Sequence, residues 1–182
     1  LTEVPTKLCN FHLGHPAGDW DKGKMVIQQE GAEQPISHVQ NKLKPACKWS
    51  PPPVSWAKLN VDGSFNPDDG TAGSGMVLRD HNGDIIFSAC KSLWSCPDAL
   101  HAELAGCMEG LALAHQWTEL PVILECDSLH AVQLINARSK DRSQYAMVIS
   151  EVKRLMGERE CRVTHISGEQ NNTPTIPQCS AY

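Results

Sequence analysis

The segment Lys58-Leu-Asn-Val-Asp-Gly-Ser-Phe65 decides the fold class of this chain. Leu59 and Val61 alternate with Asn60 and Asp62, and an apolar–polar alternation of period two predicts a β-strand with one buried face. Successive side chains of a strand point to opposite faces, so Asp62 is expected to point away from the face that carries Leu59 and Val61. Taken alone, Asp62 is compatible with an ordinary turn residue before a glycine.

Two further acidic residues change that interpretation. Glu103 lies in His101-Ala-Glu-Leu-Ala105, near the start of a helical pattern, and Asp127 ends the apolar run Val122-Ile-Leu-Glu-Cys-Asp. Carboxylates from a strand, a helix and a strand end can converge on one point, where they repel each other unless divalent cations neutralise them. Hard cations prefer such oxygen ligands. Because two metal ions can together hydrolyse a phosphodiester, these acids predict a two-metal hydrolytic site.

The periodicity of the remaining sequence predicts an α/β fold. Strands are expected at 59–65, 75–79, 84–89, 122–126 and 161–166, and helices at 99–117, 128–137 and 145–156. Short turns join the first three strands, including an Asn-Gly pair that favours a hairpin. We therefore expect a mixed five-stranded sheet, with its first three strands antiparallel, flanked by helices. Asp98 and Ser128 are expected to cap the first two helices.

Composition divides the chain into three parts. Residues 1–53 lack sustained periodicity and are interpreted as a linker or disordered arm, which ends in a stiff Pro-Pro-Pro spacer. Residues 54–172 form the expected domain, and 173–182 form a divergent tail. Residues 1–57 hold six basic and five acidic residues, whereas 58–182 hold 10 and 16. A domain this acidic is a poor general nucleic-acid binder, because phosphate contacts need cations.

The eight cysteines form no Cys-x-x-Cys pair. Several fall on expected core elements, where a free cysteine behaves as a small apolar residue. We therefore expect a reducing, intracellular compartment, nuclear or cytoplasmic. No apolar run reaches the length of a membrane span, so no membrane association is expected. The spacing Cys9-x-x-His12-x-x-His15 offers three zinc ligands but lacks a fourth, and short motif matches of this kind arise often by chance.

Four segments together resemble a known family. Trp49-Ser-Pro-Pro-Pro53, Lys58–Phe65, Ala102–Ala105 and Glu125–Ser128 resemble the type 1 ribonuclease H fold over about residues 49–172. Within that fold they are most similar to the plant ribonuclease H-like domains of retroelement-derived, reverse-transcriptase-like proteins. The resemblance depends on three acidic motifs, on their order and on the elements between them. It is therefore more specific than any single Asp-Gly-Ser.

The resemblance implies an activity and a site. It implies an endonuclease that cleaves the RNA strand of RNA/DNA hybrids, acts as a monomer and uses two Mg²⁺ (or Mn²⁺) ions. Asp62, Glu103 and Asp127 would be both the metal ligands and the catalytic residues. Nucleic acid would contact Gly63, Ser64 and Ser128. Backbone and hydroxyl groups of this kind can recognise a ribose 2′-OH.

The C-terminal segment departs from the family pattern. Gly168 stands where the family usually has arginine, and Thr175 stands where a fourth acidic residue or a histidine is expected, although Asn171 fits. Pro174 and Pro177 are incompatible with the interior of a regular helix, so the C-terminal helix is expected to be missing. The loss of a fourth acidic position is expected to weaken metal binding and catalysis.

Two alternatives to this nuclease remain. The first is a degenerate ribonuclease H-like module that binds nucleic acid or a protein partner without cleavage, which the altered C-terminus and the acidic composition favour. The second is a 3′–5′ exonuclease of related architecture. Such an enzyme normally carries an Asp-x-Glu pair on its first strand, and the segment around Asp62 has none.

Overall fold

The structure, a computed structural model, describes residues 7–8, 49–93 and 96–168, all within one compact unit. Its elements are β1 (Lys7–Leu8), β2 (Ala57–Phe65), β3 (Ala72–Arg79), β4 (Ile85–Leu93), α1 (Ala99–Trp117), β5 (Val122–Cys126), α2 (Leu129–Asn136), α3 (Ala146–Gly157) and β6 (Cys161–His165). Every helix and strand expected from sequence is present. Four expectations concern residues that the structure does not describe. They are the zinc-like Cys/His motif, most of the N-terminal arm, the divergent tail and the absence of a last helix.

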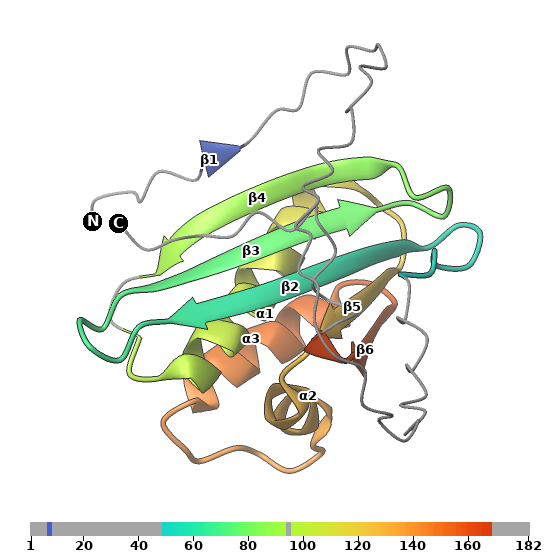
Figure 1. Cartoon of the computed structure of the whole chain (residues 1–182). Helices are drawn as coiled ribbons and strands as arrows, with labels where there is room; N and C mark the ends of the chain where they lie inside the picture. Colours follow the sequence, from blue (N-terminus) through green and yellow to red (C-terminus); the bar gives the residue numbers. More distant parts are fainter. Residues whose placement is uncertain (1–6, 9–48, 94–95, 169–182) are drawn as a thin grey trace, which may run out of the picture. The chain divides into compact units, whose positions relative to one another are not determined.

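The strands form one sheet in the order β1-β4-β3-β2-β5-β6 (Figure 1). β2, β3 and β4 pair antiparallel, whereas β5 pairs parallel with both β2 and β6. The expected mixed sheet of five strands is confirmed. The structure adds β1, a two-residue strand that pairs antiparallel with β4 and falls in the segment interpreted as a linker. Two residues are too short for a periodic signal, and the open backbone groups of an edge strand accept such pairing whatever the side chains.

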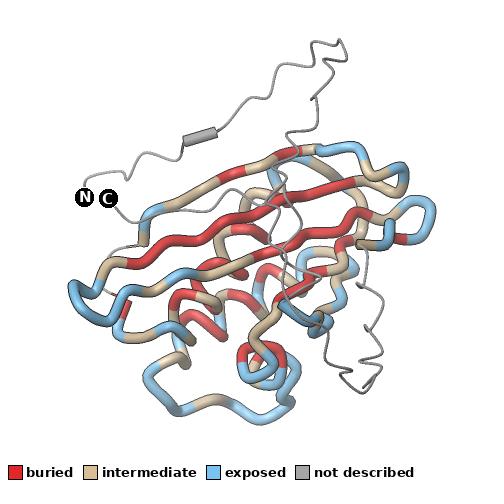
Figure 2. The backbone as a smooth tube through the Cα atoms, in the orientation of Figure 1, coloured by how far each residue is buried: buried red, intermediate tan, exposed pale blue. Residues whose placement is uncertain are grey.

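An apolar core fills the space between the sheet and the helices. Figure 1 shows α1 and α3 behind the sheet, and the residues buried between the two layers include Leu59, Leu78, Leu104, Leu124 and Ile149. Figure 2 shows that buried residues run along the central strands β2 and β3. Each fully buried side chain of this size stabilises the fold by about 1.5–3 kcal/mol. The core thus fixes α1 against β2, the two elements that carry Glu103 and Asp62.

Both expected helix caps are present. The Asp98 side chain accepts a hydrogen bond from the His101 backbone N–H at 2.9 Å, and Ser128 Oγ accepts one from the Ala131 N–H at 3.3 Å. Asp98 also accepts a hydrogen bond of 2.7 Å from the Tyr145 hydroxyl. It therefore fixes the start of α1 and ties it to the start of α3.

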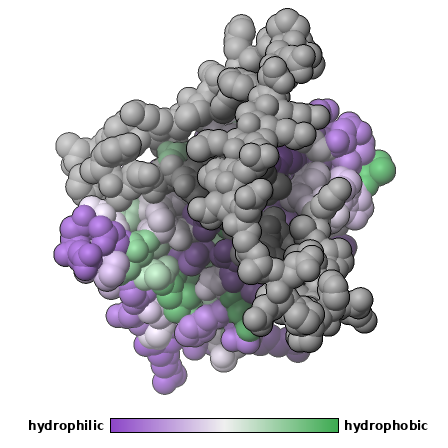
Figure 3. All heavy atoms as spheres, in the orientation of Figure 1, coloured by the Kyte–Doolittle hydropathy of each residue, from purple (hydrophilic) through white to green (hydrophobic). Residues whose placement is uncertain are grey.

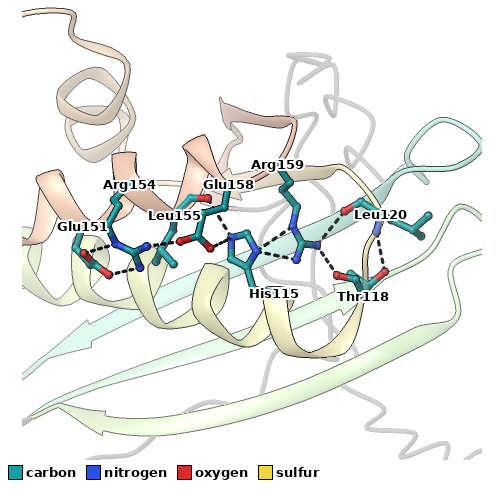
Figure 4. A network of polar contacts seen from close by, with 8 residues as sticks. All are labelled: His115, Thr118, Leu120, Glu151, Arg154, Leu155, Glu158 and Arg159. Atoms are coloured by element: carbon teal, nitrogen blue, oxygen red, sulfur yellow. Dashed lines mark hydrogen bonds and ion pairs between the residues drawn. The ribbon is translucent and has the colours of Figure 1, made fainter.

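A network of paired charges joins the C-terminal ends of α1 and α3 (Figure 4). Arg159 donates from Nη2 to His115 Nδ1 at 2.7 Å and from Nη1 to the Leu120 carbonyl at 3.1 Å. Because a guanidinium only donates, Nδ1 of His115 accepts and Nε2 carries the proton, which it donates to the Leu155 carbonyl at 3.0 Å. We call His115, Glu151, Arg154, Glu158 and Arg159 the paired cluster. Each ionic side chain in it has a partner.

A second polar cluster lies on the face of the sheet that points away from the helices. Lys58 Nζ lies 2.7 Å from Glu125 Oε1, and Asn60 Nδ2 donates to Glu125 Oε2 at 2.8 Å. Trp49 Nε1 donates to Asn60 Oδ1 at 3.1 Å. From sequence we expect Glu125 to be solvated, and this expectation is wrong, since Glu125 is 9% exposed. The parallel register brings Lys58 and Asn60 beside it and makes its burial possible.

No helix among residues 49–93 and 96–168 is long and apolar enough to cross a bilayer. On the described part of the face that Figure 3 shows, hydrophobic and hydrophilic residues are mixed. The large exposed apolar side chains come from separate segments of the chain: Val54, Ile85, Trp117, Leu129 and Met147.

One cysteine departs from the expected free state, since Cys90 is disulfide-bonded.

Candidate metal centre

The register between β2 and β5 brings two of the three expected acids together. In this parallel pair Val61 lies opposite Cys126, and Asp62 and Asp127 each follow by one residue. Neighbouring strands lie about 4.8 Å apart, so the two carboxylates leave adjacent strands at the same level. Residues 65 positions apart in the sequence thereby reach the same edge of the sheet.

A close approach of backbones brings in the third acid. A Cβ atom on Gly63 would lie 2.7 Å from the backbone nitrogen of Glu103 and 2.9 Å from its Cα, so no side chain fits there. One helical turn further along α1, a Cβ on Gly106 would lie 2.8 Å from Val61 Cγ1. Glycine at these two positions lets α1 lie directly on β2. Glu103 consequently lies beside the residue that follows Asp62.

The tightest group of possible ligands contains a thiol. One ligand atom from each of Glu103, Cys126 and Asp127 lies within 4.8 Å of the others. Asp62 is outside this group, although the charge of Asp127 raises the pKa of Asp62 and the charge of Asp62 raises the pKa of Glu103. We call Asp62, Glu103 and Asp127 the acidic cluster. From the sequence Cys126 is expected only to be an apolar core residue, and its place among the possible ligands is not predicted. Its position directly before Asp127 was the available signal.

The acidic cluster is electrostatically strained in the absence of a cation. Burial, and then the nearby Cys126, Asp127 and Asp62, raise the pKa of Glu103 to about 9. Burial, and then the charge of Asp127, raise the pKa of Asp62. Among the residues that the structure describes, no lysine, arginine or histidine forms an ion pair with any of the three. A divalent cation would remove this repulsion and favour the ionised carboxylates.

The remaining expected site residues are at the edge of the cluster. Ser64 is exposed, and its Oγ donates to the Gly73 carbonyl at 3.3 Å. Ser128 is half-buried, and its hydroxyl caps α2. Gly168 lies beside Asp127, because a Cβ there would be 3.5 Å from Asp127 Oδ2. The structure therefore places no side chain at the position where the family usually has arginine. Asn171 and Thr175 lie outside the described residues.

The donor set fits a hard divalent cation. Mg²⁺ and Mn²⁺ bind carboxylate oxygens and water, and three carboxylates from three elements supply the oxygens. Three features together define a ribonuclease H fold with a candidate metal site. They are the mixed sheet whose strands β2, β3 and β4 are antiparallel, the packing of α1 on β2, and the carboxylates at the strand ends.

Comparisons with known proteins agree with this class. A model of the reverse transcriptase-like family matches residues 60–175, and the chain belongs to that family. A protein of Arabidopsis thaliana that is provisionally named a ribonuclease H protein is 29% identical over 137 residues. The match covers 75% of this chain and 22% of that protein, so the chain spans only about a fifth of its curated relative.

Solved structures agree on the fold. Ribonuclease H1 from the archaeon Halobacterium salinarum aligns with a TM-score of 0.59 and 19% identity, over 66% of this chain and 91% of that one. LC11-RNase H1, solved in complex with an RNA/DNA hybrid, aligns with a TM-score of 0.55 and 18% identity, over 64% of this chain and 88% of that one. The resemblance to ribonuclease H-like domains inferred from sequence is confirmed at the level of family and fold.

Proposed function

We propose that this chain is a metal-dependent endonuclease that cleaves the RNA strand of RNA/DNA hybrids. The observation that carries the proposal is the convergence of Asp62, Glu103 and Asp127 without a cationic partner among the described residues. Charged groups held at this cost are typical of functional sites. The ribonuclease H1 solved with an RNA/DNA hybrid supports the substrate class.

The three acids would supply metal ligands from three elements in the proposed mechanism. Two bound Mg²⁺ or Mn²⁺ ions would supply Lewis-acid stabilisation and an activated water. Asp62 and Asp127, at the ends of adjacent strands, would hold the ions through their carboxylates, and Glu103 would complete the ligand set from α1. Because its pKa is raised to about 9, Glu103 must release a proton when a cation binds near neutral pH. No side chain is needed as a nucleophile.

Residues beside Asp62 would position the RNA strand. Ser64 is exposed, and Gly63 lies between it and Asp62, so the hydroxyl and the local backbone can contact a ribose 2′-OH. The Ser128 hydroxyl already accepts the Ala131 N–H. Because Ser64 is exposed whereas Ser128 is half-buried and caps α2, we assign the larger share of substrate contact to Gly63 and Ser64.

Cleavage of a labelled RNA/DNA hybrid in Mg²⁺ or Mn²⁺ tests the proposal. Asp62→Asn is expected to lower the rate by about a thousandfold, since the stabilisation that bound metals give is several kcal/mol. Asp84→Asn is the matched control, because Asp84 is exposed in the β3–β4 turn. Equal cleavage by the parent and Asp62→Asn would assign the activity to a contaminant and refute the enzyme.

A non-cleaving binding module is the second candidate. It is favoured by the bare backbone at Gly168 and by the position of Asp62 outside the tightest ligand group. Hybrid binding measured by fluorescence anisotropy in the same buffers separates the two functions. Binding that saturates, without cleavage in either metal, would support the module.

A further inference from the structure

Two buried thiols lie directly behind the carboxylates of the candidate metal centre. Cys126 Sγ lies 3.6 Å from Glu103 Oε2 and donates to it. The Cys107 thiol is hydrogen-bonded to Cys126, and both cysteines are fully buried. Glu103 and Cys107 are one helical turn apart on α1 and therefore share a face of the helix. Cys126 and Asp127 are consecutive at the end of β5.

We propose that Glu103, Cys126 and Asp127 form a site for a thiophilic divalent cation, Zn²⁺ or Cd²⁺, with Cys107 as an adjoining thiol. Zinc binds sulfur at about 2.3 Å and carboxylate oxygen at about 2.0 Å, so a tetrahedral site separates the two ligands by about 3.5 Å. The Cys126 sulfur and the Glu103 oxygen are 3.6 Å apart. The third ligand atom, from Asp127, lies within 4.8 Å of both.

The mixed donor set distinguishes this site from the proposed magnesium site. Mg²⁺ selects oxygen ligands, whereas thiolate selects Zn²⁺ and softer ions. Binding converts the Cys126 thiol to a thiolate, and its proton goes to solvent. The inference rests on the proposed function only in that the two sites share Glu103 and Asp127. A thiophilic ion bound there excludes Mg²⁺ from those carboxylates and therefore inhibits cleavage.

The test is a titration of the full chain with CdCl₂ under anaerobic conditions, followed by the ultraviolet charge-transfer band of the cadmium–thiolate bond. Cys126→Ala is expected to remove a component of the band and to weaken cadmium affinity by at least about tenfold, the lower end of the effect of losing a metal-site residue. Cys161→Ala is the matched control, because Cys161 is a free cysteine at the opposite end of β6. Subtracting the absorbance change of each variant from that of the parent protein gives the contribution of one thiol to the band.

A second variant keeps the test decisive if Cys126→Ala fails to fold. Glu103→Gln retains both thiols, and its expected result is a weakened cadmium affinity with the band still reached at saturation. If a folded variant, Cys126→Ala or Glu103→Gln, gives the same cadmium titration as the parent protein, the proposed site is refuted. The readout is independent of hydrolysis. A parent protein that binds Cd²⁺ through Cys126 but never cleaves supports this inference and refutes the nuclease. A parent protein that cleaves but does not bind Cd²⁺ through Cys126 supports the nuclease and refutes this inference.

Discussion

The two ends of α1 carry two clusters of ionisable side chains that differ in one respect. Glu103, near the start of the helix, belongs to the acidic cluster, where the charges of Asp127 and Asp62 act on it and the described residues supply no counter-charge. His115, about 18 Å further along the axis, belongs to the paired cluster, where Arg159 and Glu158 have partners. Balanced charges of the second kind stabilise a fold. Unbalanced charges of the first kind cost stability and are retained where a ligand neutralises them.

The largest expected effect is at Glu103, where activity and stability should change in opposite directions. Glu103→Gln is expected to lower metal-dependent cleavage by about a thousandfold. The same change should raise the free energy of unfolding of the metal-free protein by about 1–3 kcal/mol, because it removes a buried acid from like charges. Denaturant unfolding and hybrid cleavage measure the two effects.

Glu119→Gln is the control for this change, because Glu119 is exposed just after α1. It should leave both quantities unchanged. If Glu103→Gln is less stable than the parent, the acidic cluster is structural and the contrast between the two ends of α1 fails.

The second prediction concerns pH. The pKa of Glu103 is about 9 in the folded protein, against an ordinary value of 4.5, so between these values the folded state holds a proton that the unfolded state has lost. Stability from this group is fully present at low pH and is lost as pH rises. In the metal-free protein the free energy of unfolding should fall by about 1 kcal/mol per pH unit between about pH 5 and pH 9.

Thermal unfolding in EDTA over this range, repeated with excess Mg²⁺, measures the effect. Mg²⁺ should make the unfolding free energy fall less steeply with pH, and Glu103→Gln should not show this fall. A metal-free parent whose stability rises with pH would contradict the assignment.

The third prediction concerns the paired cluster. Arg159→Ala removes hydrogen bonds to His115 Nδ1 and to the Thr118 and Leu120 carbonyls. The expected loss is about 2 kcal/mol of unfolding free energy, with cleavage by the remaining folded protein unchanged. Arg142→Ala is the control, since Arg142 is exposed, and its effect should be within about 0.5 kcal/mol. A loss of cleavage in folded Arg159→Ala would show that the two ends of α1 are coupled.

The smallest expected effect is at the cap of α1. Asp98→Ala should cost about 1 kcal/mol, because the His101 N–H loses its acceptor. Tyr145→Phe removes the hydrogen bond from the Tyr145 hydroxyl to Asp98 and the one that this hydroxyl accepts from Gln144 Nε2, but it keeps the hydrogen bond from the His101 N–H to Asp98. Chemical denaturation of both variants measures the difference. An Asp98→Ala protein as stable as Tyr145→Phe would mean that the cap contributes nothing.

Sequence alone determined every described helix and strand except β1, and it identified the candidate acids. Alternating residues such as Leu59 and Val61 identify a strand because the side-chain period is a local property of the backbone. The same locality explains why the caps at Asp98 and Ser128 were predicted correctly. The acids at 62, 103 and 127 were found because their motifs occur in a family order.

Only the tertiary structure decided which side chains meet. The burial of Glu125 depends on Lys58 and Asn60 arriving from the neighbouring strand, and the contact of Cys126 with Glu103 at the candidate metal centre depends on α1 lying against β2 across Gly63. Both contacts join residues far apart in the chain. Distances between such residues follow from strand register and backbone approach, which no local pattern encodes.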